Sequence, residues 1–196
     1  MLHMVYGGSA SGKSSYAESF AMSLQGEGRL LYIATMYPYK WNTTEIDPET
    51  MQRIERHRAM RADKGFDTVE CYRHVEHIVA KRQDVLLLEC MSNLLANEMY
   101  LEQDSDDGSD MAETMSPVSN KIVQALIDLS TRVQELVIVT NDVFSDGGSL
   151  TYDESTREYV KNLAEINCAL AREAATVTEI VCGIPVIVKK NHPMGK

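Results

Sequence analysis

The feature that most constrains the fold is a Gly-rich loop between an apolar run and a helical pattern near the N-terminus. The loop consists of Gly7, Gly8, Ser9, Ala10, Ser11, Gly12, Lys13 and Ser14. It fits the pattern G-x-x-x-x-G-K-[ST], and it lies where the mechanism of that motif requires, between a strand and a helix. Glycines let the backbone curl so that its N–H groups point at phosphate oxygens, and the helix adds the positive end of its dipole. We therefore predict a phosphate-binding loop rather than a chance Gly/Ser turn, with Lys13 on the outer phosphates and Ser14 on Mg²⁺.

The rest of the chain alternates apolar runs with helical patterns, which is typical of a mainly parallel sheet flanked by helices. We expect strands at residues 2–6, 30–35, 66–70, 85–89, 136–140, 178–182 and 185–188. We expect helices at residues 13–24, 49–62, 94–101, 122–133 and 153–175, and loops at residues 36–48, 102–110 and 141–152. No internal repeat or linker is visible. The sequence therefore predicts a single α/β P-loop nucleotide-binding domain over residues 1–190, with residues 191–196 as a C-terminal tail.

Composition excludes several classes of function. The formal net charge of −10 argues against a nucleic-acid partner, because duplex binders carry basic faces. The longest apolar stretches, such as residues 85–88, are far shorter than the roughly 20 residues that span a bilayer, and no signal peptide is visible. The cysteines are scattered without a CxxC pair, which argues against a zinc site. We interpret Cys71, Cys90, Cys168 and Cys182 as reduced, mostly core-filling thiols of a cytoplasmic protein.

A P-loop enzyme also needs a carboxylate at a neighbouring strand end to hold its metal ion. Glu89 follows the apolar run at residues 85–88, and Asp142 follows the run at residues 136–140. A charged residue at such a place is often only the point where a buried strand meets water. We favour the metal role for Glu89 and leave it open for Asp142.

A basic segment stands out in this acidic chain. Arg53, His57 and Arg61 recur at four-residue spacing, so that a helix places them on one face. With Arg56 and Arg58, this face suits a polyphosphate clamp, a general base or a nucleophile that attacks phosphorus. The alternative is a solvated helix face that pairs with Glu49, Glu55 or Glu70, and spacing alone slightly favours that alternative.

The remaining histidines give weaker signals. His74 and His77 are three residues apart, but no HExxH pattern accompanies them, so a surface pair is favoured over a metal site. His3 and His192 lie near the termini and carry no functional signal.

Several segments together resemble the bifunctional adenosylcobinamide kinase and adenosylcobinamide-phosphate guanylyltransferase family of cobalamin synthesis. The resemblance covers residues 2 to 189 in order and spacing. Its pieces are the Gly-rich loop with Ala17-Glu18, Leu31-Tyr32-Ile33-Ala34-Thr35, Arg53-Ile54-x-x-His57-Arg58-x-x-Arg61, Val69-Glu70, Leu86-Leu87-Leu88-Glu89-Cys90, Val139-Thr140-Asn141-Asp142-Val143, Arg157-x-Tyr159, Asn167 and Val181-x-Gly183-Ile184.

The resemblance implies that one P-loop domain runs two reactions. A kinase step would phosphorylate adenosylcobinamide with ATP or GTP, and a second step would transfer GMP from GTP to adenosylcobinamide phosphate through a GMP–histidine intermediate. The family's nucleophile falls on His57, with Lys13 as the other catalytic residue and Mg²⁺ held by Ser14 and Glu89. The family also implies a homo-oligomer, a trimer. Besides the loop, the positions that would bind nucleotide are Ala34, Thr35, Met36, Arg58, Ala59, Met60, Arg61, Glu70 and Glu89.

The sequence departs from the family pattern at several points. Ala62 stands where the family often has Pro, and the segment between Thr35 and Arg53 is longer than usual and contains the only Trp, Trp41. Ala164 replaces a glycine of the family. Two alternatives stay open: a P-loop kinase of another small alcohol, and a non-catalytic GTP-binding module.

Overall fold

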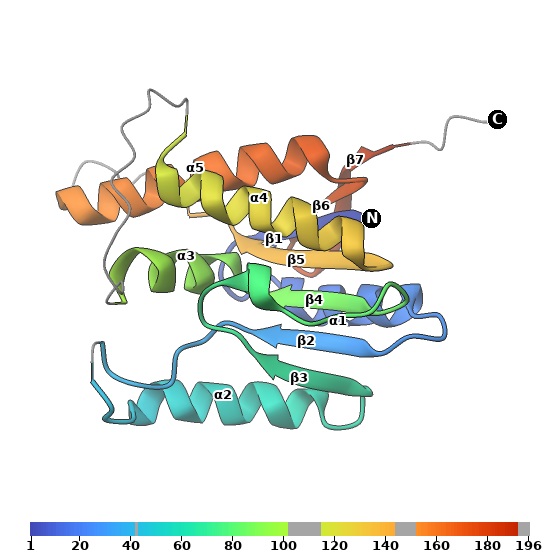
Figure 1. Cartoon of the computed structure of the whole chain (residues 1–196), viewed down its shortest axis with the longest axis horizontal. Coiled ribbons are helices and arrows are strands. Elements are labelled where there is room, and N and C mark those ends of the chain that lie inside the picture. Colours follow the sequence, from blue (N-terminus) through green and yellow to red (C-terminus); the bar gives the residue numbers. More distant parts are fainter. Residues whose placement is uncertain (42, 102–114, 144–151, 192–196) are drawn as a thin grey trace.

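The computed structural model describes residues 1–41, 43–101, 115–143 and 152–191. Within them, seven strands form one sheet in the order β3-β2-β4-β5-β1-β6-β7 (Figure 1). All neighbouring strands are parallel except β6 and β7, which are antiparallel. The predicted mainly parallel sheet is therefore confirmed. Its strands are β1 (Leu2–Gly7), β2 (Leu30–Ala34), β3 (Phe66–Glu70), β4 (Val85–Glu89), β5 (Glu135–Asn141), β6 (Thr176–Val181) and β7 (Ile184–Lys190).

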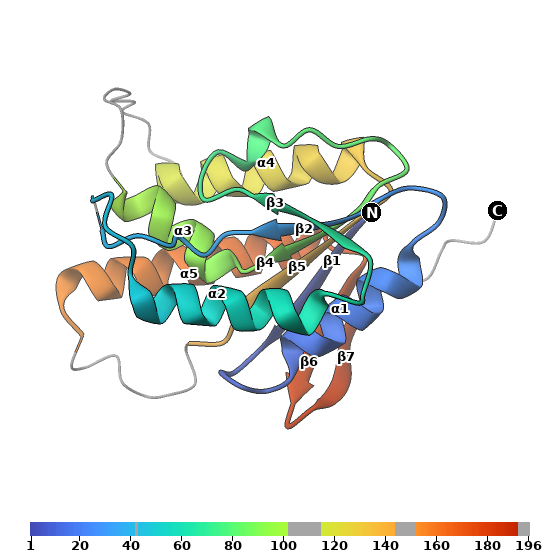
Figure 2. The same cartoon turned by 90° about the horizontal axis from the view of Figure 1, so that it is seen from below.

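Helices cover both faces of the sheet, as Figure 2 shows for α4 on one side and α1 on the other. The helices are α1 (Lys13–Leu24), α2 (Pro48–Arg61), α3 (Met91–Tyr100), α4 (Pro117–Arg132) and α5 (Glu154–Glu173), with a short 3₁₀ turn η1 (Val75–His77). Because side chains alternate along a strand, Leu86 and Leu88 enter the core under α3, α4 and α5. Val85 and Leu87 enter the second core, under α1. The all-apolar sequence of β4 is thus explained by burial on both faces.

The helix and strand types were predicted correctly, but several boundaries differ. Helix α3 begins three residues earlier than expected and α4 begins five residues earlier. At α4, Ser116 is the N-cap and accepts a hydrogen bond from the backbone N–H of Ser119, with Pro117 in the first turn. The apolar periodicity begins only at Ile122, and it therefore missed this polar first turn. The predicted loop at residues 102–110 and most of the loop at residues 141–152 lie outside the described residues.

The carboxyl ends of the parallel strands meet at one edge of the sheet. Ala34 pairs with Glu70 on one side and with Glu89 on the other. Gly7, where β1 enters the predicted phosphate loop, pairs with Asn141 at the end of β5. In open α/β sheets, ligands bind at this edge. The fold thus gathers the ends of five strands around one place.

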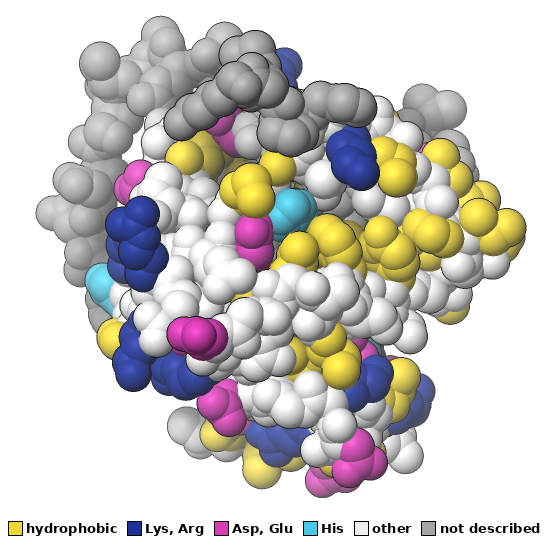
Figure 3. All heavy atoms as spheres, turned by 90° about the vertical axis from the view of Figure 1, so that its right-hand side faces the viewer, with side chains coloured by type: hydrophobic (Ala, Val, Ile, Leu, Met, Phe, Trp, Pro, Cys, Tyr) yellow, Lys and Arg dark blue, Asp and Glu magenta, His cyan; other side chains and the backbone are white. Residues whose placement is uncertain are grey.

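The last two strands form a hairpin whose outer strand is exposed. Cys182 and Gly183 both have positive φ, at 51° and 82°, and they make the two-residue turn. Ile184 is 66% exposed and Ile187 is 62% exposed, although β7 is apolar. Figure 3 faces the side on which β7 lies in Figure 1 and shows apolar side chains gathered on its right-hand part. This strand therefore extends the sheet without entering its core.

The interpretation of the cysteines as mostly core-filling thiols is wrong for two of the four. Cys168 and Cys182 are exposed, whereas Cys71 and Cys90 are partly buried and pack against the two cores. His3 carries a structural role, because its ring nitrogens lie 2.8 Å from Thr176 Oγ1 and 2.8 Å from Glu135 Oε2. Both features depend on which strands lie side by side, which residue type alone does not reveal.

Candidate functional site

The Gly-rich loop connects β1 to α1 in the conformation that its sequence predicts. Gly12 has φ 93°, a left-handed conformation that favours glycine, directly before the helix begins at Lys13. A side chain at Gly7 would place a Cβ 2.7 Å from the carbonyl oxygen of Ile180, so the strand needs glycine there. The loop is also fixed from β6–β7, because the Gly183 N–H donates to the carbonyl oxygen of Ser11 at 2.9 Å.

Lys13 lies over its own loop. Its Nζ donates to the carbonyl oxygen of Gly8 at 2.9 Å, and the residue is only 9% exposed. Burial lowers the pKa of Lys13, while the neighbouring Glu89 and Cys90 act in the opposite direction. A cation whose hydrogen-bond partner among the described residues is a neutral carbonyl can exchange that partner for a charged phosphate oxygen.

Glu89, at the end of β4, is the carboxylate that faces the loop. Its Oε2 accepts a hydrogen bond from the Tyr32 hydroxyl at 3.1 Å, and its side chain lines the same pocket as Lys13 and Ser14. Asp142 is placed differently: its backbone N–H donates to Gly7 O at 3.0 Å, and it does not line that pocket. Of the two candidate carboxylates, Glu89, which the sequence favoured, lines the pocket and Asp142 does not.

Helix α2 brings its basic face to the pocket. Arg61 is 5% exposed, and its guanidinium carbon lies 3.4 Å from the centre of the Tyr32 ring. Its Nε and Nη1 have no hydrogen-bond partner among the described residues. A buried arginine with unused donors at a pocket wall is suited to an anion.

The rest of α2 is anchored by ion pairs rather than by an apolar face. Lys64, just after the helix, pairs with the buried Glu18 of α1, and Arg58 pairs with Glu70 at the end of β3. Arg61 is the one buried residue of the helix. The pairing with Glu70 that was considered as an alternative is thus present, yet it positions the helix beside the pocket rather than away from it.

The pocket between α2 and the strand ends has a volume of about 610 Å³. Five of its lining side chains are cationic, Lys13 with Arg53, Arg56, Arg58 and Arg61, whereas two, Glu70 and Glu89, are anionic. The chain as a whole has a net charge of −10. Positive charge is therefore concentrated in this pocket, as polyphosphate binding requires.

Most of the predicted site residues meet here. The predicted residues that line the pocket are Ser9, Ala10, Lys13, Ser14, Ala34, Met36, His57, Arg58, Met60, Arg61, Glu70 and Glu89. Six others do not line it: Gly7, Gly8, Ser11, Gly12, Thr35 and Ala59. The three glycines belong to the backbone of the loop and do not line the pocket. Thr35 is fully buried, and its hydroxyl donates to Cys90 O at 2.9 Å and accepts from Cys90 N–H at 2.7 Å.

Sequence reasoning missed other lining residues. They are Tyr32, Ile54, Tyr72, Cys90, Ser92, Asn93, Val139 and Asn141. Two of them could have been found from their place at the end of an apolar strand, because Cys90 directly follows β4 and Asn141 is the last residue of β5. Tyr32 gave none, because a tyrosine inside a strand is indistinguishable from a core residue until α2 is placed over it.

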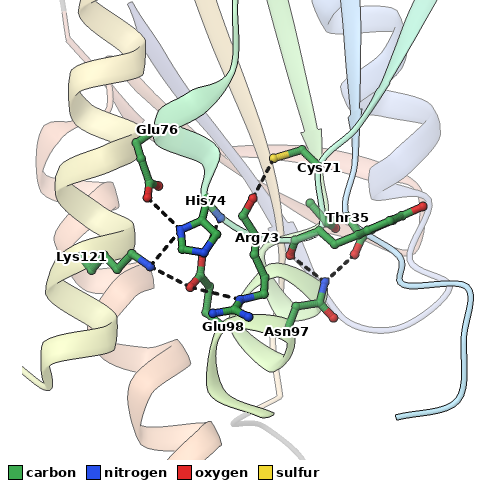
Figure 4. Close-up of polar contacts among 9 residues, drawn as sticks. Thr35, Cys71, Arg73, His74, Glu76, Asn97, Glu98 and Lys121 are labelled. Carbon is green, nitrogen blue, oxygen red and sulfur yellow. Dashed lines mark hydrogen bonds and ion pairs between the residues drawn. The ribbon is translucent and has the colours of Figure 1, made fainter. Parts of the chain in front are cut away.

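Behind the pocket, α3 ties the strand ends together (Figure 4). The Asn97 amide donates to the carbonyl oxygens of Thr35 at 2.8 Å and Tyr72 at 2.9 Å. Next to it, the buried Glu98 accepts the His74 backbone N–H at 2.7 Å and Lys121 Nζ at 3.0 Å. The segments that follow β2 and β3 are therefore held by one helix.

His74 belongs to this support. Its ring Nδ1 lies 3.1 Å from Glu76 Oε1, and the ring stacks on His77 at a centroid distance of 5.7 Å. Among the described residues, no group of three or more His, Cys, Asp or Glu side chains is arranged to hold a metal ion. The described helices also include none that is long and apolar enough to cross a membrane.

Comparison with known proteins assigns the chain to a family. The model of the family described as cobinamide kinase / cobinamide phosphate guanyltransferase matches residues 3–188. The chain belongs to this family. The bifunctional adenosylcobalamin biosynthesis protein CobU of Escherichia coli (strain K12) is 30% identical, and the match covers 96% of this chain and 100% of that protein. The protein of the same name from Salmonella typhimurium (strain LT2) is also 30% identical, with the same coverage.

Among solved structures, the chain is similar to the flagellar accessory protein FlaH from Methanocaldococcus jannaschii. The TM-score is 0.49 at 12% identity, and the match covers 97% of this chain and 78% of the FlaH chain. A likeness of this size carries no argument about function. The family resemblance seen in the sequence is confirmed by the family model and by these two sequence relatives.

Proposed function

We propose that the protein is an adenosylcobinamide kinase and adenosylcobinamide-phosphate guanylyltransferase of cobalamin synthesis. The observation that carries the proposal is the joint position of Lys13, Ser14 and His57 on one basic pocket. Family membership supports it, because the curated relatives are named as bifunctional adenosylcobalamin biosynthesis proteins. We take residues 1–190 as one P-loop domain that uses this pocket for both steps.

In the kinase step, the hydroxyl oxygen of adenosylcobinamide forms a bond to the γ-phosphorus of ATP or GTP. The bond from that phosphorus to the β–γ bridging oxygen breaks, and the hydroxyl proton is released. Lys13 and the N–H groups of the loop hold the outer phosphates in line for this transfer. The enzyme thus contributes mainly positioning and charge.

In the guanylyl step, an imidazole nitrogen of His57 forms a bond to the α-phosphorus of GTP. The α–β phosphoanhydride bond breaks and pyrophosphate leaves. A phosphate oxygen of adenosylcobinamide phosphate then attacks the same phosphorus, the N–P bond breaks, and the imidazole is restored. Arg61 has free donors beside Tyr32 for the charge that develops on phosphate oxygens.

The pocket has donors that fit Mg²⁺. A magnesium ion in a nucleotide site keeps waters and phosphate oxygens as ligands and needs only one or two protein oxygens. The Ser14 hydroxyl and the Glu89 carboxylate line the pocket together, and both are ligands that this ion prefers. When bound, the ion would offset charge on the transferred phosphate and on the leaving group.

The guanylyl step is tested by labelling. Incubation with α-labelled GTP should leave label on the protein that is stable to base and released by acid, as a phosphoramidate is. His57→Ala should abolish this label. His77→Ala is the matched control, because His77 is exposed and lies outside the pocket, and it should label normally.

The outcomes separate the alternatives. Phosphoryl transfer to another alcohol without any protein-bound GMP would indicate a P-loop kinase. Tight GTP binding without turnover of any corrinoid would indicate a GTP-binding module. Full labelling of His57→Ala would show that another residue is the nucleophile.

We also propose that the protein acts as a homo-oligomer, which the family resemblance gives as a trimer, in the cytoplasm. Four free cysteines and the use of ATP and GTP support that compartment. The exposed apolar strand β7 supports assembly, because Val186 and Val188 are 44% and 57% exposed in the single chain. Light scattering should give about three times the mass of one chain, and Ile184→Lys with Ile187→Lys should reduce it to one.

A further inference from the structure

A second cavity, of about 460 Å³, lies beside the site. It is lined by Trp41, Ala96, Tyr100, Thr156 and Tyr159. Helix α3 is common to the two cavities. Ser92 and Asn93 line the site, whereas Ala96 and Tyr100, four and eight residues after Ser92, line the second cavity. Such spacing puts them on one side of the helix, and Asn93 and Tyr100 are separated by about 10 Å along its axis.

A continuous row of aromatic rings joins the two cavities. Tyr72 lines the site, and its ring centroid lies 5.4 Å from that of Tyr37. Tyr37 stacks on Trp41 at 6.4 Å, and Trp41 meets Tyr100 edge to face at 6.2 Å. A ligand on this row would therefore lie next to the reacting groups.

The outer half of the row is exposed, whereas Tyr37 and Tyr72 are half-buried. Trp41 is 52% exposed and Tyr100 is 37% exposed. The segment that carries Trp41 is fixed at its base, where Tyr39 and Ile46 form an antiparallel bridge and the Lys40 N–H donates to Glu45 O at 2.9 Å. A well-anchored turn that presents large aromatic rings to solvent is typical of a binding surface.

The lining also limits the chemistry of the ligand. Among the described residues, the five that line the cavity are all uncharged. Tyr100, Thr156 and Tyr159 contribute hydroxyl groups. The Tyr159 hydroxyl already donates to Ser92 O at 3.2 Å, which ties this wall to the site. Apolar rings with neutral hydrogen-bonding groups suit a large ring system that bears methyl groups and amide side chains.

We propose that this cavity binds the macrocycle of the corrinoid acceptor, while the arm that carries the reacting hydroxyl or phosphate extends into the first pocket. The inference rests on the proposed function for the identity of the acceptor, but its binding test does not require catalysis. Trp41 and Tyr100 contact the methyl-bearing rim of the corrin, and Thr156 faces its amides. The longer segment after Thr35 thereby becomes part of acceptor recognition.

Equilibrium dialysis of the whole chain against cyanocobinamide tests the proposal, with the corrinoid measured by its visible absorbance. Trp41→Ala and Tyr100→Ala should each raise the dissociation constant about tenfold, which corresponds to ~1.4 kcal/mol. Trp41→Phe should restore most of the affinity because it keeps an aromatic ring. Ile46→Ala is the matched control, since Ile46 is also 52% exposed and lies in the same segment but outside the cavity.

The single Trp gives a second, direct measurement. Bound cyanocobinamide should protect Trp41 from quenching by acrylamide, and Trp41 is the only tryptophan, so excitation beyond the tyrosine absorption band reports on it alone.

The two proposals fail in distinguishable ways. Equal affinity of Trp41→Ala and wild type for cyanocobinamide, or no protection of Trp41, would overturn the acceptor site even if the GMP adduct forms. Absence of the adduct in wild type, with corrinoid binding still weakened by Trp41→Ala, would overturn the guanylyl step and support the corrinoid site.

Discussion

The guanidinium of Arg61 is stacked on the Tyr32 ring at 3.4 Å, and the Tyr32 hydroxyl donates to Glu89 at 3.1 Å. One side chain of β2 thus connects the basic helix α2 to the carboxylate at the end of β4. Burial raises the pKa of Tyr32, and the negative Glu89 adds to this, so the hydroxyl stays protonated as a donor. The position of the basic helix and that of the carboxylate are linked through this ring.

The ring and the hydroxyl of Tyr32 can be separated by substitution. Tyr32→Leu removes the surface on which Arg61 stacks and should slow formation of the GMP adduct about tenfold, since a desolvated cation–π contact contributes up to ~2 kcal/mol. Tyr32→Phe keeps the ring and should stay within about threefold of wild type. Single-turnover labelling with GTP measures both rates, and equal losses in the two variants would contradict the role of the stack.

Lys13→Met should reduce the kinase and guanylyl activities together. Lys13 belongs to the Gly-rich loop and lines the pocket, and loss of one pre-positioned donor typically costs about 10²–10³ in rate. Both activities are measured on the same preparation, by phosphorylated product and by protein-bound GMP. Lys40→Met is the control, because Lys40 is exposed and pairs with Glu45 at the surface. A variant that loses only one activity would show that the two reactions do not share this loop.

Asn97→Leu should destabilise the protein through two unpaired carbonyl groups. Asn97 is 3% exposed and its amide donates to Thr35 O and Tyr72 O, and each buried carbonyl left without a donor costs about 1–3 kcal/mol. Urea unfolding gives the free energy of unfolding. Asn162→Leu is the matched control, since the similarly buried Asn162 has the sulfur of Met99 at 3.5 Å as the only acceptor of its amide among the described residues, and it should lose less.

Asp84 should make stability depend on pH in acid. Burial acts to raise the pKa of Asp84, but hydrogen bonds from Arg29 and from the Lys81 backbone N–H hold it below its ordinary value. A lowered folded-state pKa means that the stabilisation is present above about pH 4 and is lost as the pH falls through the folded pKa.

Asp84→Asn should therefore be less stable than wild type by about 1–3 kcal/mol at neutral pH, because it leaves backbone donors poorly paired. The difference in the free energy of unfolding should shrink as the pH falls below about 4. Denaturant titrations at pH 7, 5 and 3 measure it, with Asp128→Asn on the exposed face of α4 as the control. A difference that is independent of pH would contradict the assignment.

Much of the architecture was predictable because its signals are local. The loop from Gly7 to Ser14 must bend to aim its N–H groups, and only a glycine-rich sequence permits that bend next to a strand and a helix. The run at residues 85–88 is apolar on both alternating faces, which marks a central parallel strand. The predicted helix boundaries were wrong where the first helical turn is polar, as in α4, which begins at Pro117.

The sequence by itself determined the phosphate loop, the succession of strands and helices, and the family to which the chain belongs. The tertiary structure decided which residues meet. The order β3-β2-β4-β5-β1 brings Tyr32 and Glu89 together, although they are 57 residues apart, and places Arg61 over them. It also decided that Trp41 faces a cavity and that Ile184 stays exposed. The physical reason is that periodicity and turn chemistry act over a few residues, whereas a site depends on strand order and helix docking, which contacts across the whole chain establish.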